Sequence, residues 1–168
     1  MHTNNLLLWA KSQMGSNEVV LSRFKLNRLV LENTELVLHQ LLRKNLELIH
    51  SISDEMILNT GRKRLNFIIR NILMNAIKFT PMGGKISILY VKRGRREIHI
   101  KDSGRGMNPE IISNLFSDRI YSQPGTNGEL GTGIGLMLSK EFAESIGAEI
   151  SVESELDLGT TFSIRLKA

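Results

Sequence analysis

Four polar side chains recur along one side of a helix predicted over residues 62–80. At ~100° per residue, Arg64, Asn71, Asn75 and Lys78 fall within a stripe roughly 60° wide. Asparagine is a mediocre helix former, so two of them one turn apart weaken the helix without capping it. The neutral amide oxygen of Asn75 is also of the kind that Mg²⁺ accepts among its ligands. A solvated polar face would explain the stripe about as well, but these two features favour the wall of a binding site.

A second candidate is Asp102, at the end of a predicted strand. Side chains two apart on a strand share a face, so the carboxylate points the same way as Ile98 and Ile100, toward the core. A buried carboxylate is costly unless a donor pairs with it. Gly104 and Gly106 follow, and they allow the backbone to bend sharply and to approach a ligand. An Asp that only caps the following turn would give the same D-x-G pattern.

Three alternating glycines, Gly131, Gly133 and Gly135, come just before another predicted helix. Backbone N–H groups at a glycine-rich helix start form a ready anion site. The same pattern occurs in the dinucleotide-binding fingerprint, which requires a strand leading directly into the glycines. Here the polar stretch 117–130 precedes them, so the sequence argues against a dinucleotide fold.

The three motifs, N-x-x-x-N-A-x-K-F-T, D-x-G-x-G and G-x-G-x-G, occur in this order. In this order they resemble the N, G1 and G2 boxes of the sensor histidine kinases, a family within the superfamily of gyrase, heat-shock-chaperone and mismatch-repair ATPases. The run 159–162 is similar to the closing G3 box, and Phe116 is a partial match to the F box. Residues 117–130 correspond to the ATP lid. The resemblance extends over roughly residues 18–167.

The resemblance implies ATP and Mg²⁺ as ligands and assigns roles to single residues. Asn75 would hold the Mg²⁺ ion, and Lys78 would reach a phosphate. Asp102 would accept a hydrogen bond from the adenine amino group, with Thr161 assisting, and Arg119 would approach the γ-phosphate. The remaining nucleotide contacts would come from the two glycine motifs: Gly104, Gly106, Gly131, Thr132, Gly133, Ile134, Gly135 and Leu136.

Asn71 stands where the ATP-hydrolysing relatives place a Glu that activates water. Its amide cannot take up a proton near neutral pH, so transfer of phosphate to a protein side chain is favoured over rapid hydrolysis. In the sensor kinases the acceptor is a His on a preceding helical hairpin, followed by Glu or Asp. None of the four histidines has such a neighbour: His2, His39, His50 and His99. We therefore expect the acceptor to lie outside this chain.

The implied fold is a two-layer α/β sandwich of the histidine-kinase ATPase type. It has a mixed, mainly antiparallel sheet of about five strands with three main helices on one face. Hydropathy patterns predict a helix from Asn27, as its cap, to Lys44, with Leu36 among its core residues. Further predicted elements are strands over 46–52 and 56–58, a hairpin around Gly94, a short helix over 108–116, a helix that begins near 135 and ends at 147, and two final strands.

The 168 residues are enough for one ordinary domain, and their 41% hydrophobic and 23% charged content is typical of a globular protein. The lack of cysteine excludes a disulfide scaffold or a thiolate metal site. We expect residues 1–17 to be the end of a dimerisation helix and a linker, and residues 18–168 to be the ATP-binding domain. The net charge of +5 permits binding to polyanions. The basic run 92–96 lacks aromatic neighbours, which favours a solvated hairpin tip over a nucleic-acid site.

As partners, the resemblance implies the dimerisation and His-phosphotransfer domain of a parent kinase and a response-regulator receiver domain, with no nucleic acid. It implies a cytoplasmic location and leaves a membrane anchor of the parent open. Two alternatives remain: a Ser-directed regulatory kinase of the same superfamily, and a non-catalytic nucleotide-sensing module. Residues 3–14, which resemble a truncated coil, argue against the first. The intact Asn75, Asp102 and glycines argue against the second.

Overall fold

The computed structural model describes residues 18–116, 125–126 and 134–167. Its elements, in chain order, are β1 (Ser22–Lys25), α2 (Leu26–Arg43), β2 (Glu47–Ser51), β3 (Ile57–Thr60), α3 (Arg62–Phe79), β4 (Lys85–Arg93), β5 (Arg95–Asp102), α4 (Pro109–Asn114), α5 (Gly135–Ser145), β6 (Glu149–Glu155) and β7 (Gly159–Arg165). Residues 1–17 lie outside the described residues, so the predicted dimerisation helix and linker stay a prediction.

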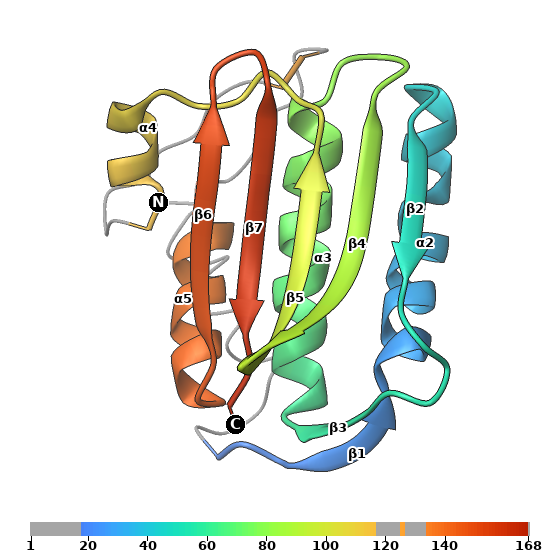
Figure 1. Cartoon of the computed structure of the whole chain (residues 1–168), viewed down its shortest axis with the longest axis vertical. Helices are drawn as coiled ribbons and strands as arrows, with labels where there is room; N and C mark the ends of the chain where they lie inside the picture. Colours follow the sequence, from blue (N-terminus) through green and yellow to red (C-terminus); the bar gives the residue numbers. More distant parts are fainter. Residues whose placement is uncertain (1–17, 117–124, 127–133, 168) are drawn as a thin grey trace.

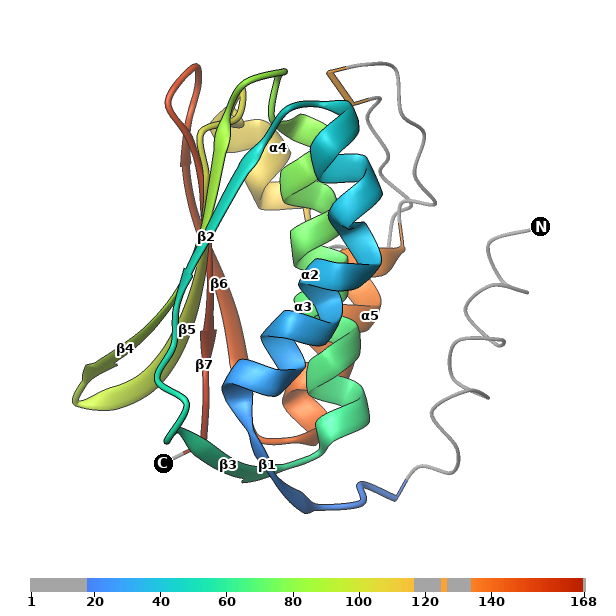
Figure 2. The ribbon, with the colours of Figure 1, turned by 90° about the vertical axis from the view of Figure 1, so that its right-hand side faces the viewer.

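The main sheet has five strands in the order β2-β4-β5-β7-β6 (Figure 1). β2 pairs with β4 in parallel, while the other three pairs are antiparallel. The short strands β1 and β3 form a separate antiparallel pair. Helices α2, α3 and α5 all lie on the same face of the sheet (Figure 2). The predicted two-layer α/β sandwich, with its mixed, mainly antiparallel sheet, is confirmed.

Helix α3 lies at the centre of the helical layer, and its apolar face forms the middle of the core. All seven apolar residues predicted to face the core are buried: Leu65, Ile68, Ile69, Ile72, Leu73, Ala76 and Ile77. Alternate residues of the central strands form the opposite wall, among them Ile86, Ile88, Ile98, Ile100, Phe162 and Ile164. The 3.6-residue period of the helix and the two-residue period of the strands therefore meet in one core.

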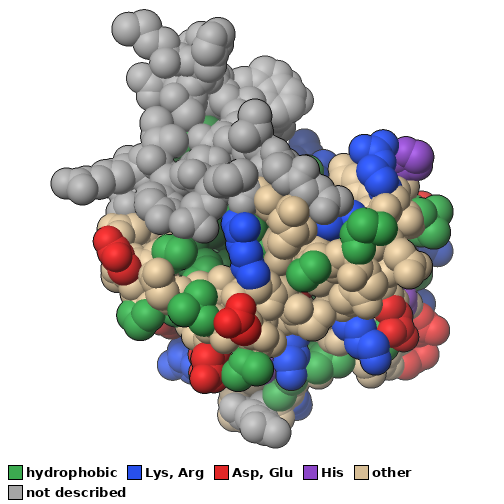
Figure 3. Space-filling model, turned by 90° about the horizontal axis from the view of Figure 1, so that it is seen from above, with side chains coloured by type: hydrophobic (Ala, Val, Ile, Leu, Met, Phe, Trp, Pro, Cys, Tyr) green, Lys and Arg blue, Asp and Glu red, His purple; other side chains and the backbone are tan. Residues whose placement is uncertain are grey.

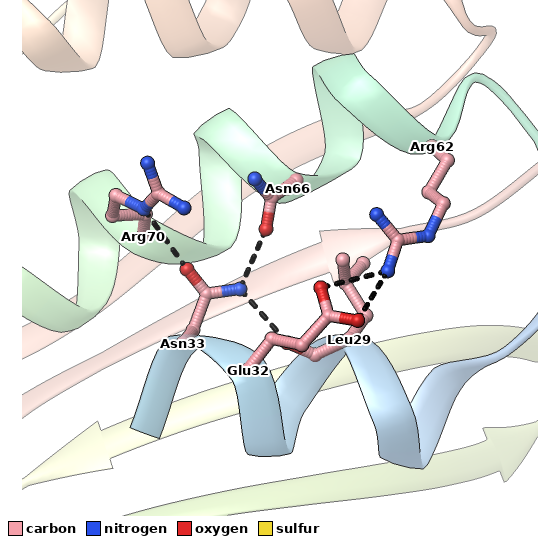
Figure 4. Close-up of polar contacts among 6 residues, drawn as sticks. All are labelled: Leu29, Glu32, Asn33, Arg62, Asn66 and Arg70. Atoms are coloured by element: carbon pink, nitrogen blue, oxygen red, sulfur yellow. Dashed lines mark hydrogen bonds and ion pairs between the residues drawn. The ribbon is translucent and has the colours of Figure 1, made fainter. Parts of the chain in front are cut away.

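A buried amide joins α2 to α3 (Figure 4). The Nδ2 group of Asn33 donates to Oδ1 of Asn66 at 2.7 Å and to the Leu29 carbonyl at 2.9 Å. Nε of Arg70 donates to Oδ1 of Asn33 at 3.2 Å. Because Asn33 has its donor and acceptor both engaged, its burial carries a smaller penalty than that of an unpaired amide.

Two sequence predictions for α2 are wrong. The helix begins at Leu26 with Lys25 as its N-cap, and Asn27 instead donates its side-chain amide to the Asp54 carboxylate. Leu36 is 61% exposed, whereas Val37 is buried. Consecutive helical residues are ~100° apart, so the core side of α2 accommodates Val37 and excludes Leu36.

The predicted hairpin around Gly94 and the predicted starts of α3, α4 and α5 are confirmed. Gly61 is the N-cap of α3, and Gly94, with φ +76°, forms the tip of the β4–β5 hairpin. Asn108 caps α4 by accepting a hydrogen bond from the Ile111 N–H, and the helix ends two residues before Phe116. Gly147, with φ +73°, ends the turn after α5, the left-handed conformation that favours glycine.

Candidate nucleotide site

The polar stripe of α3 faces the first turns of α5. Nδ2 of Asn71 lies 3.2 Å from the Ser139 hydroxyl and donates to it. A Cβ atom on Gly135, the first residue of α5, would lie 2.8 Å from Cγ of Asn71. Asn75 follows Asn71 by one turn and is half-buried. The structure thus brings the N-x-x-x-N motif and the last glycine of G-x-G-x-G into direct contact.

Arg64 does not belong to this wall, contrary to the sequence prediction. It is 9% exposed, and its guanidinium carbon lies 5.8 Å from the centroid of the Phe142 ring. Arg64 lies on the same side of α3 as Asn71 but two turns earlier. It therefore contacts the later part of α5 and not the first turns that face Asn71. Its role is to pack α3 against α5.

Lys78 lies at the carboxyl end of α3, where it shares a ring contact with a second cation, Arg105. Its Nζ atom lies 5.0 Å from the centroid of the Phe79 ring, and the Arg105 guanidinium lies 4.7 Å from the same centroid. The Arg105 N–H also donates to the Phe79 carbonyl at 3.2 Å. Cation–π contacts of this kind hold two cations from two different motifs beside one aromatic ring. Seen from this end, Lys and Arg side chains border the region drawn in grey (Figure 3).

Asp102 is buried at the end of β5, as its strand phase predicted, and is 6% exposed. One carboxylate oxygen accepts the Gly104 N–H at 2.8 Å. Burial raises the pKa of Asp102 to about 6, and backbone hydrogen bonds from Gly104 and Thr160 oppose this shift. At neutral pH the carboxylate is ionised and can accept further hydrogen bonds, as an amino group would require.

The glycines of D-x-G-x-G are required by the packing of the loop. A Cβ atom on Gly104 would lie 2.6 Å from the Phe79 carbonyl oxygen. Gly106 has φ +70°, and a Cβ atom there would lie 2.6 Å from the carbonyl carbon of Glu155. The backbone of α3 and of the β6–β7 hairpin therefore excludes a side chain at these two positions. Close approach of a ligand to these glycines stays a prediction.

The threonine beside Asp102 in the structure is Thr160, whereas the sequence analysis named Thr161. Thr160 is paired with Asp102 across the β5–β7 ladder and is 8% exposed. Thr161 is paired with Lys101, and strand alternation places it on the opposite face of the sheet. The sequence contained this signal, because Thr160 has the same phase as the inward-facing Phe162.

Ser154 also belongs to this corner, and sequence reasoning missed it. Its hydroxyl accepts the Met107 N–H at 2.9 Å, donates to the Gly159 carbonyl at 3.0 Å and lies 2.8 Å from Oγ1 of Thr160. It therefore links the D-x-G-x-G loop to the β6–β7 hairpin. A serine among the polar residues of a strand has no feature in the sequence that would indicate these contacts.

At α5, Ile134 is buried as the N-cap, Gly135 is the first helical residue and Leu136 is half-buried. Leu136 and Met137 pack against the hydrophobic core while partly buried, and the fully buried residues of α5 are Leu138, Ser139, Phe142 and Ala143. Four predicted site residues lie outside the described part of the chain and stay predictions: Arg119, Gly131, Thr132 and Gly133.

The donor set is suited to a magnesium ion held mainly by phosphate. Mg²⁺ in nucleotide sites keeps several waters and uses one or two protein oxygens together with substrate phosphates. Among the described residues, no group of three or more His, Asp and Glu side chains could form a metal cage. Asn75 offers one half-buried amide oxygen near the end of α3. A single amide ligand of this kind fits an ion bound together with a nucleotide.

The family described as histidine kinase-, DNA gyrase B- and HSP90-like ATPase matches residues 60–168. The chain belongs to this family. Histidine protein kinase DivJ of Caulobacter vibrioides is 39% identical over 115 residues, which cover 67% of this chain and 19% of DivJ. The chain spans only 18–31% of the length of such curated relatives. It is a catalytic ATPase domain of the histidine-kinase type, as the motifs predicted.

Solved structures agree on the fold of this ATPase domain. Full-length ShkA in complex with AMPPNP superimposes with a TM-score of 0.76 at 22% identity, covering 95% of this chain and 34% of that one. Histidine kinase ThkA in complex with the response regulator TrrA gives 0.72 at 22% identity, covering 98% and 48%. In the described part of this chain, no helix is long and apolar enough to cross a membrane.

Proposed function

We propose that this ATPase domain binds Mg²⁺-ATP and donates the γ-phosphoryl group to a His side chain on the dimerisation domain of a parent sensor kinase. The observation that carries the proposal is that three motifs meet along the carboxyl half of α3. The buried carboxylate of Asp102 and the cation of Lys78 lie at the end of α3, and the Asn71–Gly135 contact with α5 lies two turns earlier. Phosphoryl transfer depends mainly on positioning and charge neutralisation, which such an arrangement can supply.

In this proposal Asp102 selects adenine. The ionised carboxylate accepts a hydrogen bond from the exocyclic amino group, which guanine lacks at that position. The Gly104 N–H, bound to the carboxylate at 2.8 Å, fixes the orientation of Asp102. Thr160 lies beside it, and the Ser154 hydroxyl at 2.8 Å from Oγ1 holds that side chain in place.

The phosphates would lie between the carboxyl end of α3 and the amino end of α5. Lys78 supplies a positive charge, and the backbone N–H groups at the start of α5 supply donors. Gly131, Thr132, Gly133 and the lid residue Arg119 extend this set as predictions. Bound Mg²⁺ would neutralise charge on the phosphate oxygens, and Asn75 is the residue that we assign to hold it.

Asn71 favours transfer over hydrolysis. Its side chain is an amide that donates to Ser139 and packs on Gly135, so it holds α3 against α5 and offers no base for water. The described histidines do not replace an acceptor at the site. His99, for example, has the opposite strand phase to Asp102 and lies near Glu97 on the outer face of the sheet.

The acceptor would therefore come from the dimerisation and phosphotransfer domain, and a receiver domain would take the phosphoryl group onward. The similarity to DivJ, a histidine protein kinase, and to ThkA, which has been solved in complex with the response regulator TrrA, supports these partners. We extend the proposal to a cytoplasmic location, as expected for a domain that uses ATP.

Calorimetry on this chain tests the nucleotide site. Wild type should bind ADP and prefer it to GDP, and Asp102→Ala should weaken ADP binding roughly ten- to hundredfold because a hydrogen bond to a charged group is lost. Asn59→Ala, at an exposed position of β3 beside the other end of α3 (Figure 1), is the control and should bind like wild type. Equal ADP affinity for Asp102→Ala and wild type would reject the assignment.

Labelling with γ-labelled ATP tests the transfer. The chain alone should stay unlabelled, and adding the dimerisation domain of its parent should give an acid-labile label on that domain. Label on a Ser of a regulatory protein would identify the Ser-directed kinase instead. Tight nucleotide binding without any transfer would identify a nucleotide-sensing module.

A further inference from the structure

Lys44, which directly follows α2, is a buried cation that the proposed mechanism does not use. It is 3% exposed, and its side chain reaches the carboxyl end of α3. Nζ donates to the carbonyl oxygens of Ile77 at 2.8 Å and of Lys78 at 3.3 Å, and to Oγ1 of Thr126 at 2.6 Å. An ammonium group has three donors and no acceptor, so this set of oxygens suits it.

The carboxyl end of α3 is a favourable place for the Lys44 ammonium group. The last carbonyl groups of a helix lack partners within the helix and form the negative end of its dipole. A cation placed there meets both needs, and the burial of its charge is compensated by hydrogen bonds. Lys44 thus closes the end of α3 from the side of α2.

Thr126 joins the same point from the stretch between α4 and α5. Its N–H donates to the Lys78 carbonyl at 2.9 Å, and its hydroxyl lies 3.3 Å from the Thr80 carbonyl oxygen. Gly125 beside it is buried. The peptide group of Lys78 is therefore held by Lys44 and by Thr126 together.

The backbone of Lys44 holds the turn that follows α3. Its carbonyl accepts the Gly83 N–H at 3.0 Å, and the Gly84 carbonyl accepts the N–H of Glu47, the first residue of β2, at 3.0 Å. The next residue, Asn45, has φ +52° and turns the chain toward β2. Side chain and backbone of Lys44 thus fix the end of α3 on both sides.

We infer that Lys44 is a positioning residue for the phosphate part of the site, acting through the peptide of Lys78 and through Thr126. The inference rests on the proposed function, which assigns the Lys78 side chain to a phosphate. Lys44 does not touch the nucleotide in this scheme. It fixes the carboxyl end of α3 and hence the backbone position of Lys78. Through Thr126 it also joins the α4–α5 connection to the end of α3.

The test compares a triphosphate analogue with adenosine, which has no phosphate. Lys44→Met keeps the length and apolar stem of the side chain and removes the ammonium. We expect Mg²⁺-AMPPNP affinity, measured by calorimetry, to fall about tenfold, as for loss of a hydrogen bond to a charged group. Adenosine affinity, measured by NMR titration, should change less than about twofold, because Asp102 is held by other contacts. Lys63→Met, at the exposed first turn of α3, is the matched control and should leave both affinities unchanged.

A purely structural role would weaken both ligands alike, and no role would weaken neither, so either result overturns the inference. Thr126→Val decides the matter if Lys44→Met does not fold, since it removes one hydroxyl only. It should lower AMPPNP affinity about threefold with adenosine unchanged, a loss of the size of a neutral hydrogen bond. In the double variant the losses should be less than multiplicative, because the residues share one interaction. If wild type itself binds no AMPPNP, the proposed function fails rather than this inference.

Discussion

Asn71 and Gly135 are in such close contact that a side chain at residue 135 would force the Asn71 amide to move. A Cβ atom at Gly135 would lie 2.8 Å from Cγ of Asn71 and nearer still to Oδ1. The contact joins the middle of α3 to the first residue of α5. Two motifs that are 64 residues apart in the sequence therefore depend on each other's size, which makes the pair a direct test of the architecture.

Gly135→Ala should destabilise the domain by about 1–3 kcal/mol, the usual cost of an extra methyl group in a packed interior. Urea unfolding followed by circular dichroism measures this change. Asn71→Ala provides the matched control, because it opens space where the new methyl group would go. The double variant should recover most of the lost stability. A double variant no more stable than Gly135→Ala alone would contradict the contact.

Asp102→Asn should change the pH dependence of stability. The pKa of Asp102 is raised from 3.8 to about 6 in the folded protein, so folding disfavours the ionised form. Between these values the folded state binds more protons than the unfolded state, and the contribution of Asp102 to stability falls as the pH rises. At pH 7 this penalty is on the order of 2–3 kcal/mol.

Asp102→Asn removes the titrating group, so its stability relative to wild type should rise between pH 4 and pH 7. Urea unfolding at several pH values measures this difference. Glu153→Gln, at an exposed position of β6, is the control and should follow the wild-type curve within error. A constant difference between Asp102→Asn and wild type across this range would show that burial does not shift the titration of Asp102.

Thr160→Val and Thr161→Val are isosteric changes at neighbouring positions of β7. Because only Thr160 shares the face of Asp102, Thr160→Val should weaken ADP binding several-fold, the value of about 1 kcal/mol for one neutral hydrogen bond. Thr161→Val should leave ADP affinity unchanged. Calorimetry distinguishes the two, and the reverse result would restore the role first predicted for Thr161.

Asn75→Ala should act through the metal ion. The loss of one Mg²⁺ ligand should weaken Mg²⁺-ATP binding far more than binding of ADP in the presence of a chelator. Titrations of both ligands into the variant and into wild type give the comparison. Similar losses with and without Mg²⁺ would mean that Asn75 only supports the structure of α3.

Much of this fold could be predicted from periodicity. The apolar side of α3 and the inward phase of Asp102 follow from regular spacing in long, well-patterned elements. The errors arose where the pattern was weaker. Along α2, leucines occur on every side, so the phase that buries Val37 and exposes Leu36 was decided by packing against α3 and the sheet.

The parts of the site that were missed depend on contacts distant in sequence. Lys44 is of a residue type that is almost always exposed, and its burial becomes favourable through oxygens distant in sequence, those of Ile77, Lys78 and Thr126. Arg64 shares its helical stripe with Asn71, and its contact with Phe142 in α5 could not be predicted from the stripe. Thr160 could have been found, because strand phase alone distinguishes it from Thr161.

The hairpin tip at Gly94 offers a place to attach a reporter. β5 runs from Arg95 beside the tip to Asp102 at the other end, a span of roughly 23 Å at 3.3 Å per residue. Nothing lies within 4 Å of a Cβ atom built on Gly94, and the tip leaves the sheet beyond the last rung that β5 shares with β7, at Glu97. Exposed hairpin tips of this kind tolerate inserted peptides well. A fluorophore carried there would follow tumbling and complex formation of the domain without touching the nucleotide end.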